Sequence, residues 1–331
     1  MKILILRFSS IGDIVLTTPV VRCLKKKYPD AEIHYATKKA FHSVLKHSPY
    51  ISKFHLLENS FDELADKLKQ ENYDYVIDLH NNQRTLLLKL RMGVKSYSFN
   101  KLNIEKWLMI NFKINRLPHK HIVDRYLETC APLGVTNDGE GLDYFLGPED
   151  NIDLTTLPTA FQNGYVAWVI GAKQNTKKFP AVKVASAIGT LTKPVMLLGG
   201  KEDNAEAEAI IQAAKTAAPL YNAAGKYSLN QSASLVQQAK LVVANDTGLM
   251  HMAAAFKRPL ITIWGNTIPQ FGMYPYFGKH NVPEQRFQVE GLACRPCSKL
   301  GYSACPKGHF KCMNDIDEKR LASAIHAMWG L

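Results

Sequence analysis

Apolar residues are grouped along this chain into short runs that are separated by longer amphipathic segments. The runs at residues 3–6, 32–36, 75–79, 165–170, 195–198, 241–243 and 260–264 predict β-strands. The segments at 15–27, 60–71, 181–191, 205–217, 229–238 and 249–256 predict helices. Near-continuous apolar strands that alternate with helices are typical of a parallel sheet covered on both faces.

This alternation occurs twice. It fades in the Gly-, Pro-, Asn- and Asp-rich segment 137–164 and resumes with "YVAWVIGA". Because 331 residues also exceed what one hydrophobic core usually serves, we expect an α/β protein of two Rossmann-like, doubly wound domains, residues 1–155 and 156–331. The last helix is a candidate to pack back on the first domain. Ligands of such sheets bind at the carboxyl ends of strands, so we expect the chemistry in loops that directly follow strands.

The chain is basic, with 41 Lys and Arg against 29 Asp and Glu, and its net charge of +12 favours an anionic partner. The segment 84–125 holds ten Lys or Arg, two acids, and the aromatic residues Tyr97, Phe99, Trp107 and Phe112. One interpretation is a solvated helical face whose aromatic side chains lie in the core. The other is a binding surface for a phosphorylated or membrane-embedded acceptor. We do not expect a nucleic acid as partner, because no recognised nucleic-acid-binding motif accompanies the charge.

Signals for membrane insertion and export are not recognised in the sequence. No apolar run approaches the ~18–20 residues that span a bilayer. The N-terminal run is strand-like and lacks the apolar region and small-residue cleavage site of a signal peptide. We therefore expect a cytoplasmic protein.

The first candidate site is "RFSSIGDIVLTTP", which directly follows the first predicted strand. Gly12 permits another backbone or a ligand to approach closely, and Ser9 and Ser10 lie in the same turn. Asp13 begins the next helix. It is either a helix-start acid favoured by the helix dipole or a general base that takes a proton from an attacking hydroxyl in a cleft between the domains.

The second candidate site is "VVANDTGLMHMAAAF", in which a turn at Asp246, Thr247 and Gly248 leads from a strand into a helix that begins near Leu249. The free N–H groups at that helix start, with the Thr247 hydroxyl, form a site for an anion. Asp246 either orients the loop or binds a sugar hydroxyl. His251 is either a packed core residue or a part of the ligand site.

Two further loops follow predicted strands. In "GAKQNTKKFP", Lys173, Lys177 and Lys178 either neutralise a diphosphate or form a solvated basic loop. In "LLGGKEDNAEAEAI", Glu202 or Asp203 opens a helix after two glycines. An acid at that position either holds the hydroxyls of a ribose or caps the helix.

Four of the six cysteines lie close together near the C-terminal end, at Cys294, Cys297, Cys305 and Cys312, with His309 among them. In a cytosolic protein such a group suggests a metal before disulfides. The first spacing suits zinc, whereas the later spacings are looser than those of common zinc motifs. A structural zinc ion, reduced thiols and disulfides are all consistent with the sequence.

Two phosphate-binding signatures are missing from the sequence, GxGxxG and GxxxxGK[ST], which disfavours dinucleotide-dependent redox chemistry and P-loop chemistry. Taken together, the segments quoted above resemble glycosyltransferase family 9, the ADP-heptose:lipopolysaccharide heptosyltransferases. "ILRFSSIGDIVLTTPVVRCLKKKYPDAEIHYAT" is similar to the N-terminal signature of the family. "NDTGLMHMAAAFKRPLITIWGNT" is similar to its second signature, and the lysine loop and the "LLGG" turn follow in the expected order.

This resemblance implies a GT-B fold, in which two Rossmann-like domains face a central cleft. It places the acceptor mainly on the first domain and the nucleotide-sugar mainly on the second. The implied reaction transfers a heptose from ADP-heptose to the inner core of lipopolysaccharide, with inversion and without a metal cofactor. The implied location is cytoplasmic, with peripheral association at the inner face of the membrane.

The resemblance also implies roles for single residues. Asp13 matches the catalytic base, Lys177 matches a diphosphate-binding lysine, and Glu202 matches a ribose-binding acid, although the alignment also admits Asp203. The donor-binding signature covers Asp246, Thr247, Gly248, Leu249 and His251. Two features depart from the best-known members: Phe179 replaces a usual Trp, and the cysteine-rich segment is additional.

Other functions remain compatible with the sequence. A related GT-B enzyme would use a different nucleotide-sugar, and a non-catalytic protein of this fold would bind a nucleotide or a lipid. A nicotinamide-dependent oxidoreductase is disfavoured by the missing glycine signature.

Overall fold

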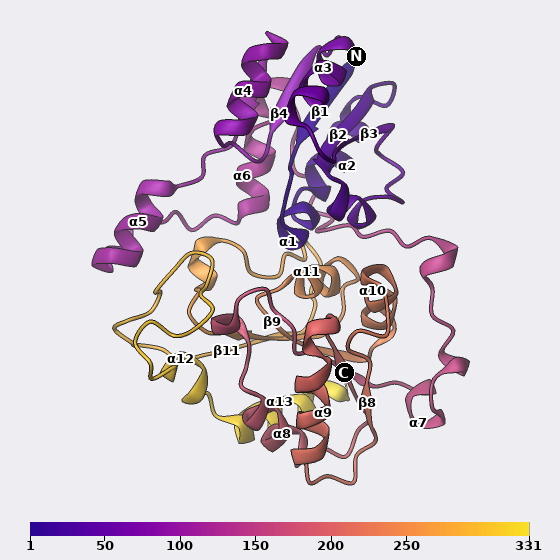
Figure 1. The fold of residues 1–331 in the computed structure, drawn as a ribbon, viewed down its shortest axis with the longest axis vertical. Helices are drawn as coiled ribbons and strands as arrows, with labels where there is room; N and C mark the ends of the chain where they lie inside the picture. Colours follow the sequence, from indigo (N-terminus) through magenta and orange to yellow (C-terminus); the bar gives the residue numbers. More distant parts are fainter. Residues whose placement is uncertain (331) are drawn as a thin grey trace.

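The computed structural model of the chain describes residues 1–330 and contains two sheets, in which all strands are parallel. The first sheet has five strands in the order β3-β2-β1-β4-β5. The second has six strands in the order β11-β10-β9-β6-β7-β8. The two sheets belong to two bodies that lie one above the other, with α1 and α11 between them (Figure 1). The predicted class, an α/β protein with two parallel sheets, is confirmed.

The elements of the first body are the strands β1 (Lys2–Leu6), β2 (Glu32–Lys38), β3 (Lys53–Leu57), β4 (Tyr75–Asp78) and β5 (Ser96–Ser98), and the helices α1 (Ile11–Val15), α2 (Thr18–Lys27), α3 (Phe61–Gln70), α4 (Gln83–Met92), α5 (Asn103–Phe112) and α6 (Ile122–Glu128). The seven predicted strands of the chain are all internal strands of the two sheets. The edge strands β3, β5, β8 and β11 were not predicted.

The elements of the second body are the strands β6 (Val166–Val169), β7 (Val195–Leu198), β8 (Leu220–Asn222), β9 (Leu241–Asn245), β10 (Leu260–Trp264) and β11 (Glu284–Gln288), and the helices α7 (Thr159–Gln162), α8 (Ala181–Ile188), α9 (Asn204–Ala213), α10 (Leu229–Gln238), α11 (Gly248–Ala255), α12 (Lys311–Asn314) and α13 (Glu318–Trp329). The expected domain boundary at residues 155 and 156 falls between the two sheets and stays a prediction.

Two helix predictions need correction. The helix expected at residues 15–27 is two helices, because α1 ends at Val15 and α2 begins at Thr18 with Pro19 in its first turn. A proline ring in a continuous helix would clash with the carbonyl four residues earlier. The last helix, α13, does not pack back on the first domain: its apolar residues Leu321 and Ile325 are buried in the core that surrounds β6 and α8.

The two bodies share part of their hydrophobic core. The core of the first sheet, which includes Ile5 and Tyr35, also includes Met252 and Ala254 of α11 and Ala233 of α10. Two further cores lie within the second body, one around the buried Trp168 and the other around the buried Trp264. Burial of apolar surface between the bodies therefore fixes α11 against the first sheet.

Helix α5 differs from the other elements because none of its residues is buried, and it projects from the side of the molecule (Figure 1). Ile104, Trp107 and Phe112 on this helix are all exposed. No helix within residues 1–330 is both long enough and apolar enough to cross a membrane. The exposed aromatic side chains contradict the interpretation in which Trp107 and Phe112 lie in the core, although Phe99 is buried.

A buried arginine joins α2 to the segment that leads toward the second body. Arg22 is 3% exposed and donates to Asp138 at 2.9 Å and to the Gly141 carbonyl at 2.8 Å. It also forms an ion pair with Asp143. These acceptors keep the Arg22 pKa above its ordinary value, although burial opposes the charge.

We expect Arg22→Met to lower the free energy of unfolding by about 3–5 kcal/mol, because the partly buried Asp143 loses its ion-pair partner and Asp138 keeps only the more exposed Lys26. Chemical denaturation followed by circular dichroism measures the change. Lys26→Met is the matched control: the Lys26 ammonium is 2.7 Å from the same Asp138, but its side chain is 53% exposed. We expect Lys26→Met to lower the free energy of unfolding by no more than about 1 kcal/mol. Equal losses for the two variants would contradict the role given to Arg22.

Candidate active site

The first site segment begins at the carboxyl end of β1, where Arg7 and Asp13 form a close ion pair. The Arg7 guanidinium lies 2.6 Å from the Asp13 carboxylate, and the two side chains are 9% and 20% exposed. Arg7 also donates to the Leu79 carbonyl at 2.6 Å, to the Ser9 carbonyl at 2.7 Å and to the Tyr126 hydroxyl at 3.0 Å. The position of the arginine is therefore fixed from several sides.

Asp13 lies in the first turn of α1, so the helix-start interpretation describes its place correctly. It accepts hydrogen bonds from the Ser10 hydroxyl at 2.6 Å and the Ser10 amide at 3.2 Å. Burial alone would raise the pKa of Asp13, but the charge of Arg7 and the two Ser10 bonds outweigh burial and hold this pKa below its ordinary value. The carboxylate is therefore ionised at neutral pH and available to accept a proton.

The second site segment follows β9, a central strand of the second sheet. The buried side chain of Asn245, the last residue of β9, donates to the carbonyls of Val169 and Ile170 at 3.3 Å. It also accepts from the Phe179 amide at 3.2 Å. Asn245 thus fixes the loop that carries the predicted lysines beside the start of α11.

Lys177 and Asp246, both predicted to bind the donor, lie together. The Lys177 ammonium is 2.5 Å from an oxygen of Asp246, which also accepts from the Thr267 hydroxyl at 2.9 Å. Asp246 therefore orients the lysine, in agreement with the loop-orienting interpretation. Thr267 was not recognised from the sequence, although "GNT" belongs to the segment that resembles the family signature.

Several buried polar atoms at this end of β9 and β10 have no hydrogen-bond partner within residues 1–330. They are the Thr247 hydroxyl, Nδ1 of His251 and the side-chain amide of Asn266. Buried polar groups in proteins are usually hydrogen-bonded, so this cluster is suited to a polar ligand. Burial lowers the pKa of His251 to about 4, and its imidazole is neutral near pH 7.

The two site segments meet directly between the bodies. A Cβ atom at Gly12 would lie 2.7 Å from Cδ2 of His251, and a Cβ atom at Gly248 would lie 2.6 Å from Cγ2 of Ile11. Only glycine permits this approach without a shift of the neighbouring groups. Leu249 packs against the cores of both bodies. The structure therefore brings together the predicted residues of α1 and α11, which are distant in sequence.

The structure distinguishes Glu202 from Asp203 by burial. Asp203 is 2% exposed, lies 2.5 Å from the Lys178 ammonium and accepts from the Gly200 amide at 2.8 Å. Its carboxylate is thus engaged within the protein. Glu202 is exposed and lies over the Gly199–Gly200 turn at the end of β7, where a ligand can reach it.

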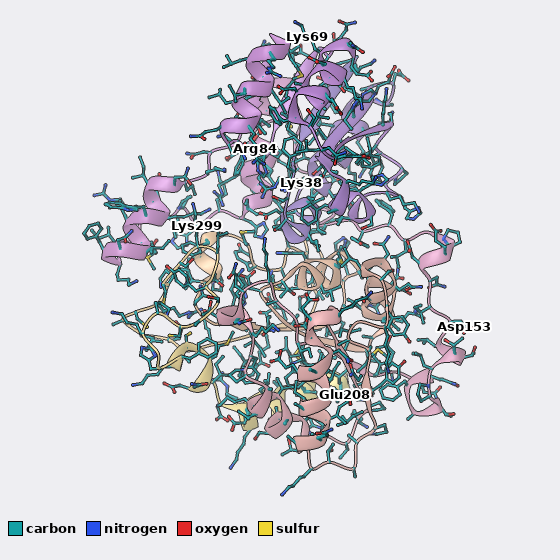
Figure 2. The ribbon with its side chains drawn as sticks, viewed as in Figure 1. Lys38, Lys69, Arg84, Asp153, Glu208 and Lys299 are labelled. Carbon is teal, nitrogen blue, oxygen red and sulfur yellow. The ribbon has the colours of Figure 1, made fainter. Side chains whose placement is uncertain are left out.

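Three lysines that were not singled out from the sequence contribute positive charge near Asp13. Desolvation of the half-buried Lys106 and the charges of Arg125 and Lys299 lower its pKa to about 8, whereas the charge of Asp13 acts to raise it. Burial, Arg7 and Lys299 similarly lower the pKa of Lys101. Lys299 comes from the cysteine-rich segment of the second body, on the side toward α5 (Figure 2). Lys101 and Lys106 of the first body and Lys299 of the second body are therefore close enough to lower the pKa of the first two.

The four cysteines of the cysteine-rich segment are free thiols. Their sulfur atoms do not form a group of three ligand atoms within 4.8 Å of one another, and residues 1–330 hold such groups only elsewhere. Cys294 Sγ lies 3.8 Å from Nε2 of His309, and the Cys297 thiol donates to the Cys294 carbonyl at 3.1 Å. This arrangement does not fit a tetrahedral zinc site, so the expected zinc ion is not supported.

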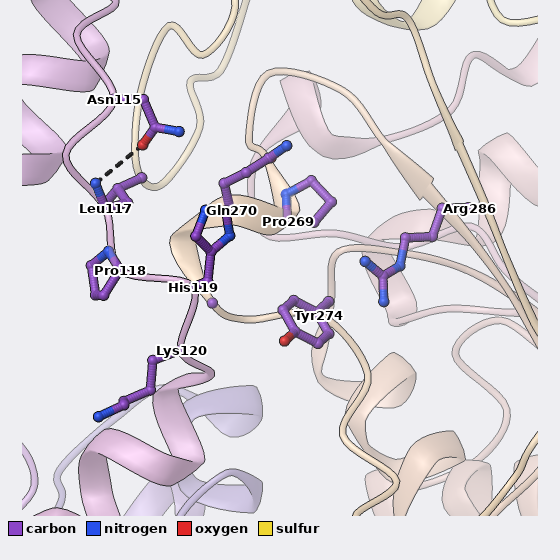
Figure 3. A pocket seen from close by; sticks show the side chains of 10 residues that line it. Asn115, Leu117, Pro118, His119, Lys120, Pro269, Gln270, Tyr274 and Arg286 are labelled. Atoms are coloured by element: carbon purple, nitrogen blue, oxygen red, sulfur yellow. Dashed lines mark hydrogen bonds between the residues drawn. The ribbon is translucent and has the colours of Figure 1, made fainter.

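A pocket of about 280 Å³ lies between the segment before α6 and the segment after β10 (Figure 3). Lys120, Gln270, Tyr274 and Arg286 line it, and the Arg286 guanidinium lies over the Tyr274 ring at 4.5 Å from its centre. None of the predicted site residues lines this pocket. It is separate from the contact of α1 with α11, and the chemistry described above does not involve it.

Comparisons with known proteins identify the family of this chain. The family model of glycosyltransferase family 9 (heptosyltransferase) matches residues 62–292, a span that begins after the Asp13 segment. Lipopolysaccharide heptosyltransferase 1 of Campylobacter coli is 26% identical over 289 residues, which cover 81% of this chain and 84% of that protein. Lipooligosaccharide heptosyltransferase 2 of Haemophilus influenzae is 28% identical over 302 residues, which cover 82% and 85%.

Solved structures share the fold across nearly the whole chain. A glycosyl transferase family 9 structure from Veillonella parvula has a TM-score of 0.78 at 22% identity and covers 99% of this chain and 97% of that one. The E. coli heptosyltransferase WaaC with ADP has a TM-score of 0.69 at 22% identity and covers 99% and 100%. These likenesses show a GT-B fold. This chain is a glycosyltransferase and belongs to glycosyltransferase family 9, the heptosyltransferase family.

Proposed function

We propose that this enzyme transfers a heptose from ADP-heptose to the inner core of lipopolysaccharide, with inversion and without a divalent metal. The observation that carries the proposal is the contact between α1 and α11, which sets the Asp13 segment beside the Asp246–Thr247–Gly248 turn. The relatives support the choice of substrates. Several are named lipopolysaccharide heptosyltransferases, and one solved relative holds ADP-2-deoxy-2-fluoro heptose.

Asp13 is the general base in this proposal. Its carboxylate accepts the proton of the acceptor hydroxyl while that oxygen attacks the anomeric carbon from the face opposite the leaving ADP. In the free enzyme Arg7 holds the carboxylate ionised but weakens it as a base. An anionic acceptor that engages the Arg7 guanidinium would relieve this effect and raise the basicity of Asp13 as it binds.

The second body binds the donor. Lys177 and the first N–H groups of α11 stabilise the negative charge that develops on the leaving diphosphate. The diphosphate replaces Asp246 as the partner of the lysine. Thr247, His251 and Asn266 supply the unpartnered polar atoms for the ligand, and the exposed Glu202 receives the ribose hydroxyls.

The first body receives the acceptor. Lys101, Lys106 and Lys299 are suited to its phosphate and carboxylate groups, because their mutual repulsion is relieved when an anion binds. Ile104, Trp107 and Phe112 give α5, the helix that carries Lys106, an exposed apolar surface, and α4 of the same body also exposes three leucines. We infer that this surface contacts the inner face of the cytoplasmic membrane, where a lipid-linked acceptor is presented.

We expect Asp13→Asn to lower kcat by about 10²–10⁴-fold, because the amide cannot accept the proton. The release of ADP from ADP-heptose in the presence of heptose-deficient lipopolysaccharide measures the rate, and titration calorimetry shows that the donor still binds. Ser10→Ala is the matched control: it removes the hydroxyl that contacts Asp13 but keeps the carboxylate, and a much smaller loss is expected. Full activity of Asp13→Asn would remove the assignment of the base.

The pH dependence tests the role of Arg7. A base accepts a proton only when ionised, so activity is lost as the pH falls through the pKa of Asp13, which Arg7 holds below the ordinary value of 3.8. In Arg7→Gln burial dominates and raises this pKa. In Arg7→Gln the acidic limb of the pH profile of kcat/KM therefore moves to higher pH. Arg7→Lys keeps a positive charge beside Asp13, so the limb should move less in that variant. An unchanged limb in Arg7→Gln would show that Asp13 is not the group that titrates.

We expect Trp107→Glu to weaken sedimentation with vesicles that contain anionic lipid, because a charged side chain replaces an exposed aromatic one at the contact. The matched control is Val182→Glu, since Val182 of α8 is 73% exposed on the other body. Equal binding by the two variants would contradict the membrane contact on α5. Activity on a water-soluble acceptor fragment should be unchanged in both.

A further inference from the structure

Side chains with metal-binding atoms meet at the end of the first sheet that is opposite the active site. His34 lies on β2, His55 lies on the adjacent strand β3, and Glu71 directly follows α3. The ligand atoms of the three residues all lie within 4.8 Å of one another. His34 is the third residue of β2, His55 is the third residue of β3, and Glu71 precedes β4, whereas Asp13 follows the carboxyl end of β1. The cluster takes no part in the transfer site.

The distances in this cluster match those of metal ligands. Zinc binds histidine nitrogens at about 2.0–2.1 Å, which in tetrahedral geometry sets two donors about 3.3 Å apart. Nδ1 of His34 and Nε2 of His55 are 3.3 Å apart. Oxygens of Glu71 lie 3.8 Å from the former and 3.6 Å from the latter. A side-chain shift of about 0.5 Å would therefore complete three positions of a tetrahedron.

The surroundings of the two imidazoles also suit a metal. His34 and His55 are 2% and 6% exposed, so both side chains are shielded from solvent. The Tyr73 hydroxyl lies 3.0 Å from both facing nitrogens, but its single proton serves only one of them. A metal ion would accept a lone pair from each.

In the structure, two lysines form ion pairs with the Glu71 carboxylate. The Lys2 ammonium lies 3.0 Å from Glu71, and Lys53 forms a second ion pair with it. Both lysines reach solvent, with side chains 27% and 54% exposed, and Lys2 has a second partner in Glu32 at 3.8 Å. An arriving cation can therefore displace them.

We propose that His34, His55 and Glu71 form a structural binding site for one divalent transition-metal ion of the zinc type. A water molecule hydrogen-bonded to Tyr73 completes the tetrahedron. The ion ties β2, β3 and the connection from α3 to β4 together at the edge of the first sheet. Imidazole and carboxylate donors at these spacings are the ligands that zinc takes in proteins.

A second group, His47 with Glu149 and Asp150, also brings three ligand atoms together and provides a control. It has one imidazole, and its carboxylates are engaged by Lys46 at 2.8 Å and by the Asn230 amide at 2.9 Å. We do not expect a tightly bound metal there.

The test uses the full chain after treatment with a chelator, with Co²⁺ as the spectroscopic probe. We expect one Co²⁺ per chain, visible-region absorption typical of tetrahedral nitrogen and oxygen coordination, displacement by Zn²⁺ and a rise in the melting temperature. His55→Gln and Glu71→Gln should each weaken binding by at least about tenfold. His47→Gln should bind as the wild type does.

Three outcomes would overturn the proposal. One is a folded chain, verified by circular dichroism, that gains no tetrahedral Co²⁺ spectrum. Another is a thiolate charge-transfer band that disappears in Cys294→Ser, which would assign the ion to the cysteine-rich segment. The last is equal Co²⁺ affinity for the wild type, His55→Gln and Glu71→Gln, all of them folded.

Discussion

The active site depends on the contact between α1 and α11, two short helices that follow central strands of different sheets. Gly12 and Gly248 make the contact close, because a methyl group at either position would overlap His251 or Ile11. Behind the glycines, Met252 and Ala254 of α11 complete the core of the first body. Apolar packing between the bodies thus positions the carboxylate of one segment beside the anion-binding turn of the other. Larger side chains at Gly12 and Gly248 would move the Asp13 segment away from the anion-binding turn.

Charge compensation is the second constraint on this site. Asp13 is paired with Arg7, and Lys177 with Asp246, so each group with a proposed chemical role already has a partner of opposite charge. A half-buried charge without a partner would be costly. In the proposed reaction the substrates take over from these partners: an anionic acceptor engages Arg7, and the donor diphosphate engages Lys177. The free enzyme then stays folded with Asp13 and Lys177 ionised. Substrate binding frees these two groups from their partners Arg7 and Asp246.

Most of the fold was predictable, and the omissions have a common cause. Internal strands such as β9 are buried on both faces and form apolar runs, whereas edge strands such as β5 ("SYS") and β11 ("EQRFQ") are short or polar and do not stand out. In the site, position after a strand made Asp13 and the loop of Lys173, Lys177 and Lys178 candidates, and the family resemblance selected Lys177 among the three lysines. The sequence could not single out Arg7 or Lys299, because their roles arise from contacts between segments distant in sequence. The cysteine spacing suggested zinc, but in the fold no three ligand atoms of this segment lie within 4.8 Å of one another.

The proposed chemistry is a single displacement in which Asp13 activates the acceptor on one side while Lys177 and α11 hold the leaving diphosphate on the other. The stereochemistry of the product tests this account most directly. After the enzyme has acted on ADP-heptose and a heptose-deficient lipopolysaccharide core, nuclear magnetic resonance of the new linkage gives its anomeric configuration. The account predicts the configuration opposite to that of the donor. Retention of the donor configuration would contradict it, because a single attack from the face opposite the leaving ADP must invert the anomeric carbon.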